Sequence, residues 1–351
     1  MAMFEHEQVV IRTGPRSGLP VIVALHSTAL GPALGGCRLA TYPHWTDGLT
    51  DALRLSAAMT VKCAVAGLPN GGGKTVVPLP AGPFDRRAVL LDVGDAIEAL
   101  DGRYGTGPDV GTGPDDMLVI GTRTRHVACR PVAAGGSGDS STHTAAGVLA
   151  ALHALCGSLF GSTDLAGRRF AVVGLGRVGA DVARRLSAAG AALVVSDVDP
   201  ARAALAASLG ADVVPPSSAL YADVDVLVPA ALGGVLTPAT VPLLRCRAVA
   251  GPANNQLDTA ATAALLHQRG IVWVPDHVVS AGGVTYAASV ELHGEPPARA
   301  AGRVAAIGDT VLALLETAAR TGGTPLAAAD ALAARRLRSA TGRQRCGQGE
   351  S

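Results

Sequence analysis

The feature that most constrains the fold of this chain is a glycine-rich turn, GLGRVG at residues 174–179, which joins an apolar run to a predicted helix. In such a turn Gly174 permits a tight bend, Gly176 lets the backbone approach a pyrophosphate, and Gly179 lets the helix pack closely on the strand. The first turn of the helix then offers its backbone N–H groups to the phosphate charge. The pattern predicts a Rossmann-type βαβ unit that binds a dinucleotide. The alternative is an ordinary glycine-rich turn without a ligand.

A carboxylate follows this turn where a dinucleotide site needs one. Asp197 closes the next predicted strand, at 192–197, and an acid at that place accepts a hydrogen bond from the ribose 2′-hydroxyl. Its negative charge also repels the 2′-phosphate of NADP. We therefore expect NAD as the cofactor.

The second half of the chain repeats the alternation of strand and helix. Repeated βαβ units of this kind form a parallel sheet with helices on both faces. The expected strands are 169–173, 192–197, 223–229, 247–251 and 271–275, and the expected helices are 178–189 and 259–270.

The first half is predicted to be a separate α/β domain. Residues 130–141, RPVAAGGSGDSS, have the composition of a linker, and a chain of 351 residues is long enough for two domains. We expect a first domain at 1–135, the Rossmann domain at 136–320 and a helical tail at 321–351. The expected elements are two strands within 9–25, a helix from a cap at Thr46 or Asp47 to Ala64, a strand at 75–77, helices at 85–100 and from 115, and a helix at 142–155.

The charge balance indicates no macromolecular partner. Lys plus Arg number 29 and Asp plus Glu 28, which gives a net charge of +1 and no basic excess for nucleic acid. We expect no membrane span and no secretory leader, and therefore a cytoplasmic protein. The six cysteines are scattered, without a CxxC pair or a histidine at ligand spacing, so we expect neither a disulfide framework nor a metal site.

Lysine is almost absent from the sequence. Of the 29 basic side chains, only Lys62 and Lys74 are lysines. A genome that favours arginine codons explains why the others are missing, but it does not explain these two. Unlike arginine, lysine can lose its proton at an accessible pH. We therefore expect a functional role for the pair, with chance survival as the alternative.

Six further segments, in both domains, carry sequence motifs: HSTALGPALGGCR (26–38), DALRLSAAMTVKCAVAGLPNGGGK (51–74), GPDVGT (107–112), GGSGDSS (135–141), GPANNQL (251–257) and VVSAGGV (278–284). With GLGRVG they resemble the glutamate/leucine/phenylalanine/valine dehydrogenase family, and the run as a whole is most similar to actinobacterial valine dehydrogenases. The resemblance implies reversible, NAD-dependent oxidative deamination of an L-amino acid to a 2-oxo acid and ammonia. It also implies an N-terminal α/β domain for substrate binding and oligomerisation, a cleft between it and the NAD-binding domain, and a homo-oligomer.

The resemblance assigns roles to residues of the first domain. It implies that Lys62 pairs with the substrate α-carboxylate, assisted by the backbone of Gly35 and Gly36. It implies that Lys74 activates the water that attacks the imine, and that Asp109 exchanges protons with the amine and with Lys74. Water activation needs Lys74 as a neutral amine, which burial and a second ammonium nearby would favour.

In the second domain the resemblance implies that the amide of Asn255 also assists in carboxylate binding and that Thr144 lies beside the nicotinamide amide. Ser280 stands where the family usually has asparagine. That departure removes one expected hydrogen bond to the nicotinamide or its ribose, although Ser280 remains a candidate cofactor contact.

The side-chain pocket decides the substrate. Leu34, Met59 and Val284 occupy pocket positions in the resemblance, and all are apolar, so nothing there pairs with the γ-carboxylate of glutamate. We expect an apolar amino acid of the valine or leucine type. Gly107 is typical of the phenylalanine enzymes, so phenylalanine is the alternative substrate. A catalytically silent homologue that only binds ligands is the other alternative.

Overall fold

The computed structural model describes the backbone of residues 5–347 and the side chains of residues 5–341. The chain divides into two compact units, whereas the sequence predicted three contiguous segments at 1–135, 136–320 and 321–351. Two later segments return to the first unit, and such returns leave no local pattern in a sequence. The first unit comprises Met1–Asp139, Ala287–Pro297 and Leu332–Ser351, and the second comprises Ser140–Tyr286 and Ala298–Ala331.

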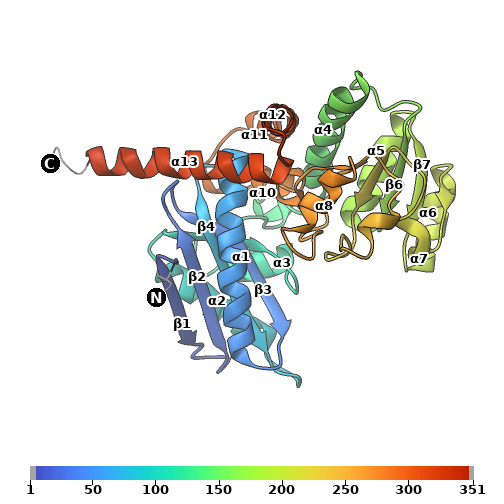
Figure 1. Cartoon of the computed structure of the whole chain (residues 1–351). Coiled ribbons are helices and arrows are strands. Elements are labelled where there is room, and N and C mark those ends of the chain that lie inside the picture. Colours follow the sequence, from blue (N-terminus) through green and yellow to red (C-terminus); the bar gives the residue numbers. More distant parts are fainter. Residues whose placement is uncertain (1–4, 348–351) are drawn as a thin grey trace. The chain divides into compact units, whose positions relative to one another are not determined.

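The first unit is built on a mixed sheet that has five strands among the described residues (Figure 1). In the order β1-β2-β4-β3-β5, the pairs β1–β2 and β2–β4 are antiparallel, and β3 is parallel to both β4 and β5. Parallel neighbours need a crossover, which helices provide. The strands are β1 (Gln8–Thr13), β2 (Pro20–Ser27), β3 (Ala33–Thr41), β4 (Gly71–Leu79) and β5 (Tyr104–Pro108).

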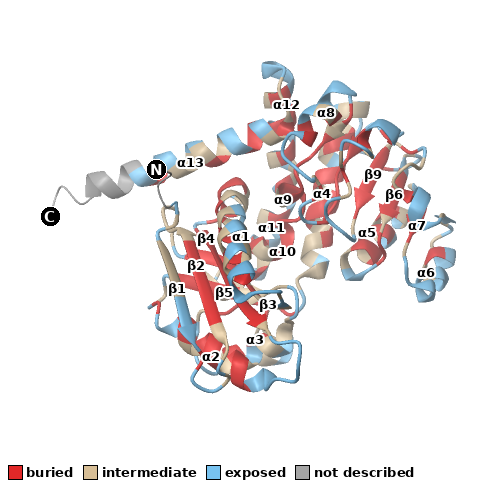
Figure 2. Cartoon of the chain, turned by 60° about the horizontal axis from the view of Figure 1, so that its bottom comes forward, coloured by how far each residue is buried: buried red, intermediate tan, exposed pale blue. Residues whose placement is uncertain are grey.

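Helices cover both faces of this sheet. α1 (Trp45–Ala66) lies on the face that carries Val76, whereas α2 (Arg86–Glu98) and α3 (Pro114–Ile120) pack on the face that carries Val77. Adjacent residues of a strand point to opposite faces, so β4 contributes to two separate apolar cores. Figure 2 shows β2 and β4 largely buried, while the outer strand β1 is half-buried or exposed.

Two expectations about local structure in this unit are wrong. The N-cap of α1 is His44, and Asp47 instead occupies the third helical position, where its carboxylate accepts a hydrogen bond from the His44 N–H at 2.9 Å. An acid at that position commonly turns back on the cap in this way, so neither Thr46 nor Asp47 is the cap. The strand expected at 75–77 begins at Gly71.

The returning segments are anchored in the first unit by polar contacts. Arg336 donates hydrogen bonds to the C=O groups of Ala64 and Val65 at 2.6 and 2.9 Å, at the C-terminus of α1. The buried carboxylate of Glu291 accepts hydrogen bonds from the N–H groups of Cys129 and Ser137. The glycine-rich stretch expected to be a linker is therefore tied to a helix that follows much later in the chain.

The second unit contains a sheet of six parallel strands among the described residues, in the order β11-β10-β9-β6-β7-β8. This confirms the predicted two-domain α/β fold with a Rossmann-type parallel sheet. β6 (Arg169–Val173), α5 (Arg177–Ala188) and β7 (Ala192–Ser196) match their predicted bounds to within one residue. Three strands are shorter than predicted: β9 (Val226–Pro229), β10 (Ala248–Val249) and β11 (Val272–Trp273). The edge strand β8 (Asp212–Val213) was not predicted.

One described helix, α4 (Ser141–Phe160), is long and apolar enough to cross a membrane by length and composition, although we expected no such segment. Its buried residues Val148, Leu152 and Leu155 lie on a helix that packs against α5 and α12. α4 is thus a core helix of this unit. The remaining helices of the two units, among the described residues, are α6 (Ala203–Ser208), α7 (Pro216–Ala219), α8 (Thr262–Gln268), α9 (Asp276–Val279), α10 (Gly282–Ala287), a π-helix (Ala288–Leu292), α11 (Pro297–Ala305), α12 (Ile307–Thr321), α13 (Pro325–Gly347) and three short 3₁₀ turns.

Candidate active site

Lys74 lies on β4 beneath α1. Its position in the strand alternation puts it on the face of Gly72 and Val76, and it is only 5% exposed. A Cβ on Gly72 would lie 2.1 Å from the backbone nitrogen of Thr60 in α1. Only glycine there lets the helix approach the strand so closely, and this approach helps to bury Lys74.

Gly36 leaves the space in which Lys74 meets Asp109. The register between β3 and β4 places Gly36 level with Lys74. A Cβ on Gly36 would lie 3.2 Å from Lys74 Nζ and 2.7 Å from Asp109 Cβ. Gly35 faces the other side of the sheet, where a Cβ would lie 1.8 Å from the carbonyl oxygen of Gly73. Both glycines are therefore required by close packing, in addition to any role of their backbone in substrate binding.

Lys74 and Asp109 form an ion pair, with Nζ 2.8 Å from Oδ2. Burial disfavours the ammonium and, even beside Asp109, holds the pKa of Lys74 below its ordinary value. Burial also disfavours the carboxylate, but the charges of Lys74 and Arg38 outweigh it and keep the pKa of Asp109 below its ordinary value. The pair is thus an ionised carboxylate beside an amine that gives up its proton more readily than a free lysine.

The loop after β5 holds Asp109 in place. The N–H of Asp109 donates to Thr112 Oγ1 at 2.9 Å, and that hydroxyl donates to the C=O of Cys37 in β3 at 2.8 Å. Gly111 adopts a positive φ of 80°, and a Cβ there would lie 2.0 Å from the carbonyl oxygen of Leu39. Asp109 is therefore both part of a tight turn and one half of the ion pair. Thr112 is a supporting residue that the sequence analysis missed.

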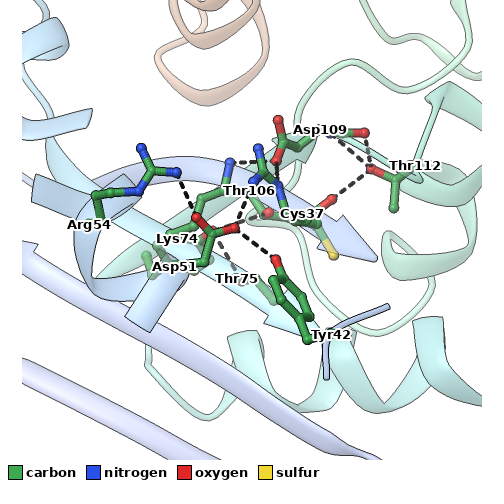
Figure 3. A network of polar contacts seen from close by, with 11 residues as sticks. Cys37, Tyr42, Asp51, Arg54, Lys74, Thr75, Thr106, Asp109 and Thr112 are labelled. Atoms are coloured by element: carbon green, nitrogen blue, oxygen red, sulfur yellow. Dashed lines mark hydrogen bonds and ion pairs between the residues drawn. The ribbon is translucent and has the colours of Figure 1, made fainter. Parts of the chain in front are cut away.

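Arg38 also belongs to this site, although the sequence analysis assigned it no role. Its Nε donates to Asp109 Oδ2 at 2.8 Å, and its Nη1 donates to Asp51 Oδ2 at 2.7 Å. Figure 3 shows Lys74, Asp109 and Asp51 in one polar network. Strand alternation could have revealed it, because Arg38 is two residues from Gly36 and so lies on the same face of the strand.

The expected substrate residues of α1 share one stripe with Asp51. Met59 and Lys62 lie on that stripe by helical periodicity, and both are half-buried. Leu34 pairs with Gly72 in the sheet, and a Cβ on Gly72 would lie 2.1 Å from the backbone nitrogen of Thr60, the residue after Met59. Leu34 therefore lies level with this part of α1.

A side chain at Gly107 would have free space around it. A Cβ built there meets a single atom within 4 Å, the carbonyl oxygen of Ala128 at 3.9 Å. Its φ is not positive, so a larger residue is compatible with the backbone. The absence of a side chain at Gly107 leaves room on β5, one strand away from Leu34.

In the second unit, each glycine of the GLGRVG turn has a geometry that fits its expected role. Gly174 has a φ of 104°, and a Cβ there would lie 2.6 Å from Ala231 Cβ. A Cβ on Gly179 would lie 2.0 Å from the carbonyl oxygen of Gly174, so helix and turn are in close contact. A Cβ on Gly176 meets nothing within 4 Å. The backbone at the start of α5 is therefore open to a ligand.

Asp197 has a structural role beside the expected ribose contact. Its Oδ2 accepts a hydrogen bond from the N–H of Leu175 in the turn at 2.5 Å, and its Oδ1 accepts one from the N–H of Asp199 at 2.8 Å. Burial disfavours the charge, but these N–H donors outweigh it and hold the pKa of Asp197 below its ordinary value. The carboxylate thus stays ionised and fixes the glycine turn to the end of β7.

Thr144 lies beside the VVSAGGV segment. A Cβ on Gly283 would lie 2.5 Å from Thr144 Oγ1, and that hydroxyl donates to the C=O of Ser140 at 3.0 Å. Ser280 Oγ donates to Asn254 Oδ1 at 3.5 Å, a long hydrogen bond. The structure thus brings Thr144 together with one glycine of this segment and links Ser280 to the GPANNQL loop.

Asn255 and Val284 are the remaining expected contacts. Asn255 is exposed, with a positive φ of 54°, and its C=O accepts a hydrogen bond from the N–H of Gly234 at 2.7 Å. Asparagine tolerates this conformation better than most residues, so its backbone shape alone accounts for part of its presence. Val284 is half-buried on α10. Among the described residues, no group of three or more His, Cys, Asp or Glu side chains is placed to hold a metal ion.

Two family models match the chain. One, for the Glu/Leu/Phe/Val dehydrogenase dimerisation domain, matches residues 5–126, and the other, for glutamate/leucine/phenylalanine/valine dehydrogenase, matches residues 201–295. The chain belongs to the glutamate/leucine/phenylalanine/valine dehydrogenase family. The resemblance of the sequence motifs to this family of oxidoreductases is confirmed.

Relatives within the family act on different amino acids. The chain is 40% identical over 343 residues to valine dehydrogenase of Streptomyces albus, covering 97% of this chain and 94% of the relative. It is 39% identical over 343 residues to phenylalanine dehydrogenase of Bacillus thermotolerans, covering 96% and 90%. Among solved structures, L-tryptophan dehydrogenase from Nostoc punctiforme is similar, with a TM-score of 0.83, 37% identity and coverage of 96% and 97%. Because these sequence identities are nearly equal, they do not show which amino acid is the substrate of this chain.

Proposed function

We propose that this chain catalyses the reversible oxidative deamination of an apolar L-amino acid. In that reaction the amino acid, NAD⁺ and water give the 2-oxo acid, ammonium, NADH and a proton. The observation that carries the proposal is the buried Lys74–Asp109 ion pair, because an amine with a depressed pKa beside a carboxylate suits proton transfer near neutral pH. Family membership supports the reaction class.

Residues of the first unit have separate roles in the proposed reaction. Lys74, as the neutral amine, takes a proton from the water that attacks the imine carbon, and the C–O bond forms as that proton moves to Nζ. Asp109 exchanges protons with Lys74 and with the departing amine. Lys62 holds the α-carboxylate through its positive charge, with the backbone of Gly35 and Gly36 beside it.

The second unit suits a dinucleotide with a free ribose 2′-hydroxyl. Gly176 and the first turn of α5 would hold the pyrophosphate, Asp197 would bind the ribose, and Thr144 with Ser280 would contact the nicotinamide end. NAD bound there would supply the acceptor for the hydride of the substrate α-carbon. The open space over Gly176 supports dinucleotide binding, and the ionised Asp197 supports NAD over NADP.

An apolar substrate follows from the expected pocket positions Leu34, Met59 and Val284, none of which can pair with a second carboxylate. We propose valine or leucine as the type of substrate. Phenylalanine is the second candidate, because the free space at Gly107 favours a larger side chain.

The assembly proposed is a cytoplasmic homo-oligomer. The match of residues 5–126 to a dimerisation domain supports assembly through the first unit. We assign most of the substrate-binding residues to this unit and nucleotide binding to the second.

The test is an assay of NADH absorbance with ammonia and a panel of 2-oxo acids. We expect reduction of 3-methyl-2-oxobutanoate and 4-methyl-2-oxopentanoate, and weaker or no reduction of 2-oxoglutarate. Phenylpyruvate as the best substrate by kcat/KM would favour the second candidate. A preference for 2-oxoglutarate would refute the assignment of the pocket, and no turnover with any acid would support a silent binding homologue.

A further inference from the structure

Arg38 connects two carboxylates within the first unit. Its Nε donates to Asp109 Oδ2 at 2.8 Å, and its Nη1 donates to Asp51 Oδ2 at 2.7 Å. Lys74 Nζ lies 2.8 Å from that same oxygen of Asp109. Two cations on the neighbouring strands β3 and β4 therefore share one carboxylate oxygen.

Asp51, at the other end of this bridge, is itself fixed. The hydroxyl of Tyr42 donates to Asp51 Oδ2 and the guanidinium of Arg54 donates to Oδ1, both at 2.7 Å. Figure 3 shows Tyr42 and Arg54 reaching Asp51 from two sides. The Arg38 and Asp51 side chains are 19% and 14% exposed, so solvent screens their interaction less than that of an open surface pair. Asp51 thus gives Arg38 a firm anchor on α1.

We propose that Arg38 is a positioning residue for the reaction: its guanidinium ties Asp109 to the anchored Asp51 and so holds the Asp109 carboxylate against Lys74. The proposal rests on the proposed function, in which Asp109 exchanges protons with Lys74. Arg38 itself transfers no proton, because a guanidinium stays charged at any accessible pH. Its planar group offers separate nitrogens in a fixed geometry, which a lysine ammonium does not.

The charges around the pair give this role a measurable consequence. Arg38 and Lys74 face Asp109, and Asp109 and Arg38 face Lys74, whose pKa the Cys37 thiol influences only through its charge. Burial raises the pKa of Cys37 to about 12, so the thiol is neutral at working pH. Arg38 favours the ionised form of Asp109, and its loss also frees that carboxylate to move. Both effects raise the pKa of Asp109.

The first test does not depend on turnover. Because the sequence has two lysines, protein labelled with ¹³C at lysine Cε gives two side-chain NMR signals, which Lys62→Arg assigns. On acidification, the Lys74 signal should report protonation of Asp109. We expect Arg38→Gln to move that inflection to higher pH and Arg38→Lys, which keeps the charge, to leave it near the wild type. Arg54→Gln is the matched control: it removes a cation from Asp51 without touching Asp109, and it should not move the inflection.

Kinetics then separate position from charge. We expect Arg38→Gln and Arg38→Lys each to lower kcat by between about 10-fold and 10²-fold, the range for misplacing a reacting group. KM for the 2-oxo acid should change little, because Lys62 holds its carboxylate. If Arg38→Gln does not fold, Asp51→Asn releases Arg38 from its anchor but keeps the charge of Arg38 beside Asp109, so it should lower kcat without moving the inflection to higher pH.

An unchanged inflection in Arg38→Gln, or an equal shift in Arg54→Gln, would overturn the proposal. A normal kcat in Arg38→Lys would overturn the positioning role, because charge alone would then suffice. If the NMR inflections move as expected but the wild-type protein turns over no 2-oxo acid, the proposed function is refuted and the bridge through Arg38 is not.

Discussion

The two units hold their functional groups in opposite ways. In the first unit, Lys74 is 5% exposed and shares an oxygen of Asp109 with Arg38, so the charges of the candidate site are packed together beneath α1. In the second unit, the glycine turn is open: a Cβ on Gly176 would meet no atom within 4 Å. The half-buried Asp197 is held by backbone N–H groups in place of a cation.

The difference follows from the task that we propose for each site. Proton transfer needs a lysine that is neutral near working pH, and burial lowers its pKa in a way that an exposed position cannot. Binding a pyrophosphate needs access to backbone N–H groups, and a side chain would block that access. The first unit therefore depends on close packing around charges, and the second depends on the absence of side chains.

The largest effect is expected from Lys74→Arg. Arginine keeps the positive charge and most of the volume, but it cannot lose its proton. We expect kcat to fall by at least about 10²-fold, the lower range for losing a general base. NADH binding, measured by fluorescence titration, should stay near the wild type because it uses the second unit.

Lys62→Arg is the matched control for this change. Arginine can still hold a carboxylate, so the loss should appear mainly in KM for the 2-oxo acid. Near-normal turnover by Lys74→Arg would refute the acid–base role of Lys74. The presence of the two lysines would then be explained by chance alone.

A smaller loss is expected from Gly36→Ala. The new Cβ would lie 2.7 Å from Asp109 Cβ and 3.2 Å from Lys74 Nζ, so the ion pair has to shift. We expect kcat to fall by about 10-fold or more, together with a lower Tm in a thermal melt. Gly82→Ala, in open space of the same unit, should change neither quantity. Equal behaviour of the two variants would show that the packing around the pair is not critical.

Asp197→Ser tests the second unit. It removes the charge that opposes a 2′-phosphate, and it weakens the hold on the Leu175 N–H. We expect the ratio of kcat/KM with NAD to kcat/KM with NADP to fall, while KM for NAD rises. An unchanged ratio would point to Asp199 or to another loop as the determinant.

The smallest effect is expected from Gly107→Ala. The methyl group fits without strain, because its nearest neighbour is 3.9 Å away, so the fold should be unaffected. We expect kcat/KM for phenylpyruvate to fall more than that for the branched 2-oxo acids. An equal change for all of them would place Gly107 outside the substrate pocket.

Local sequence predicts the second unit better than the first. The bounds of β6, α5 and β7 are correct to within one residue. The apolar period of each element is strong, and the glycine turn marks where β6 ends and α5 begins. β3, whose sequence is ALGGCRLAT, has no clear alternation and was not expected as a strand. Its glycines serve packing against Gly73 and Asp109, a requirement that depends on neighbouring strands.

The candidate site shows the same division. The lysine count and the family motifs identify Lys74 and Asp109, but they say nothing of Arg38 or Asp51. These two residues meet across a strand and a helix, and Asp197 reaches Leu175 across the glycine turn. Such contacts depend on the register and on the close approach of elements, which a single sequence does not contain.

The central claim is that burial lowers the pKa of Lys74, so that its neutral amine forms at a lower pH than that of a free lysine. Competitive labelling with acetic anhydride measures this directly, because acetylation follows the neutral amine, and fragmentation in the mass spectrometer assigns each acetyl group to Lys62 or Lys74. We expect the labelling rate of Lys74 to reach half its maximum at a pH below the ordinary lysine pKa of about 10.4. A midpoint at or above that value would contradict the account, because Lys74 would then remain an ammonium when water has to be activated.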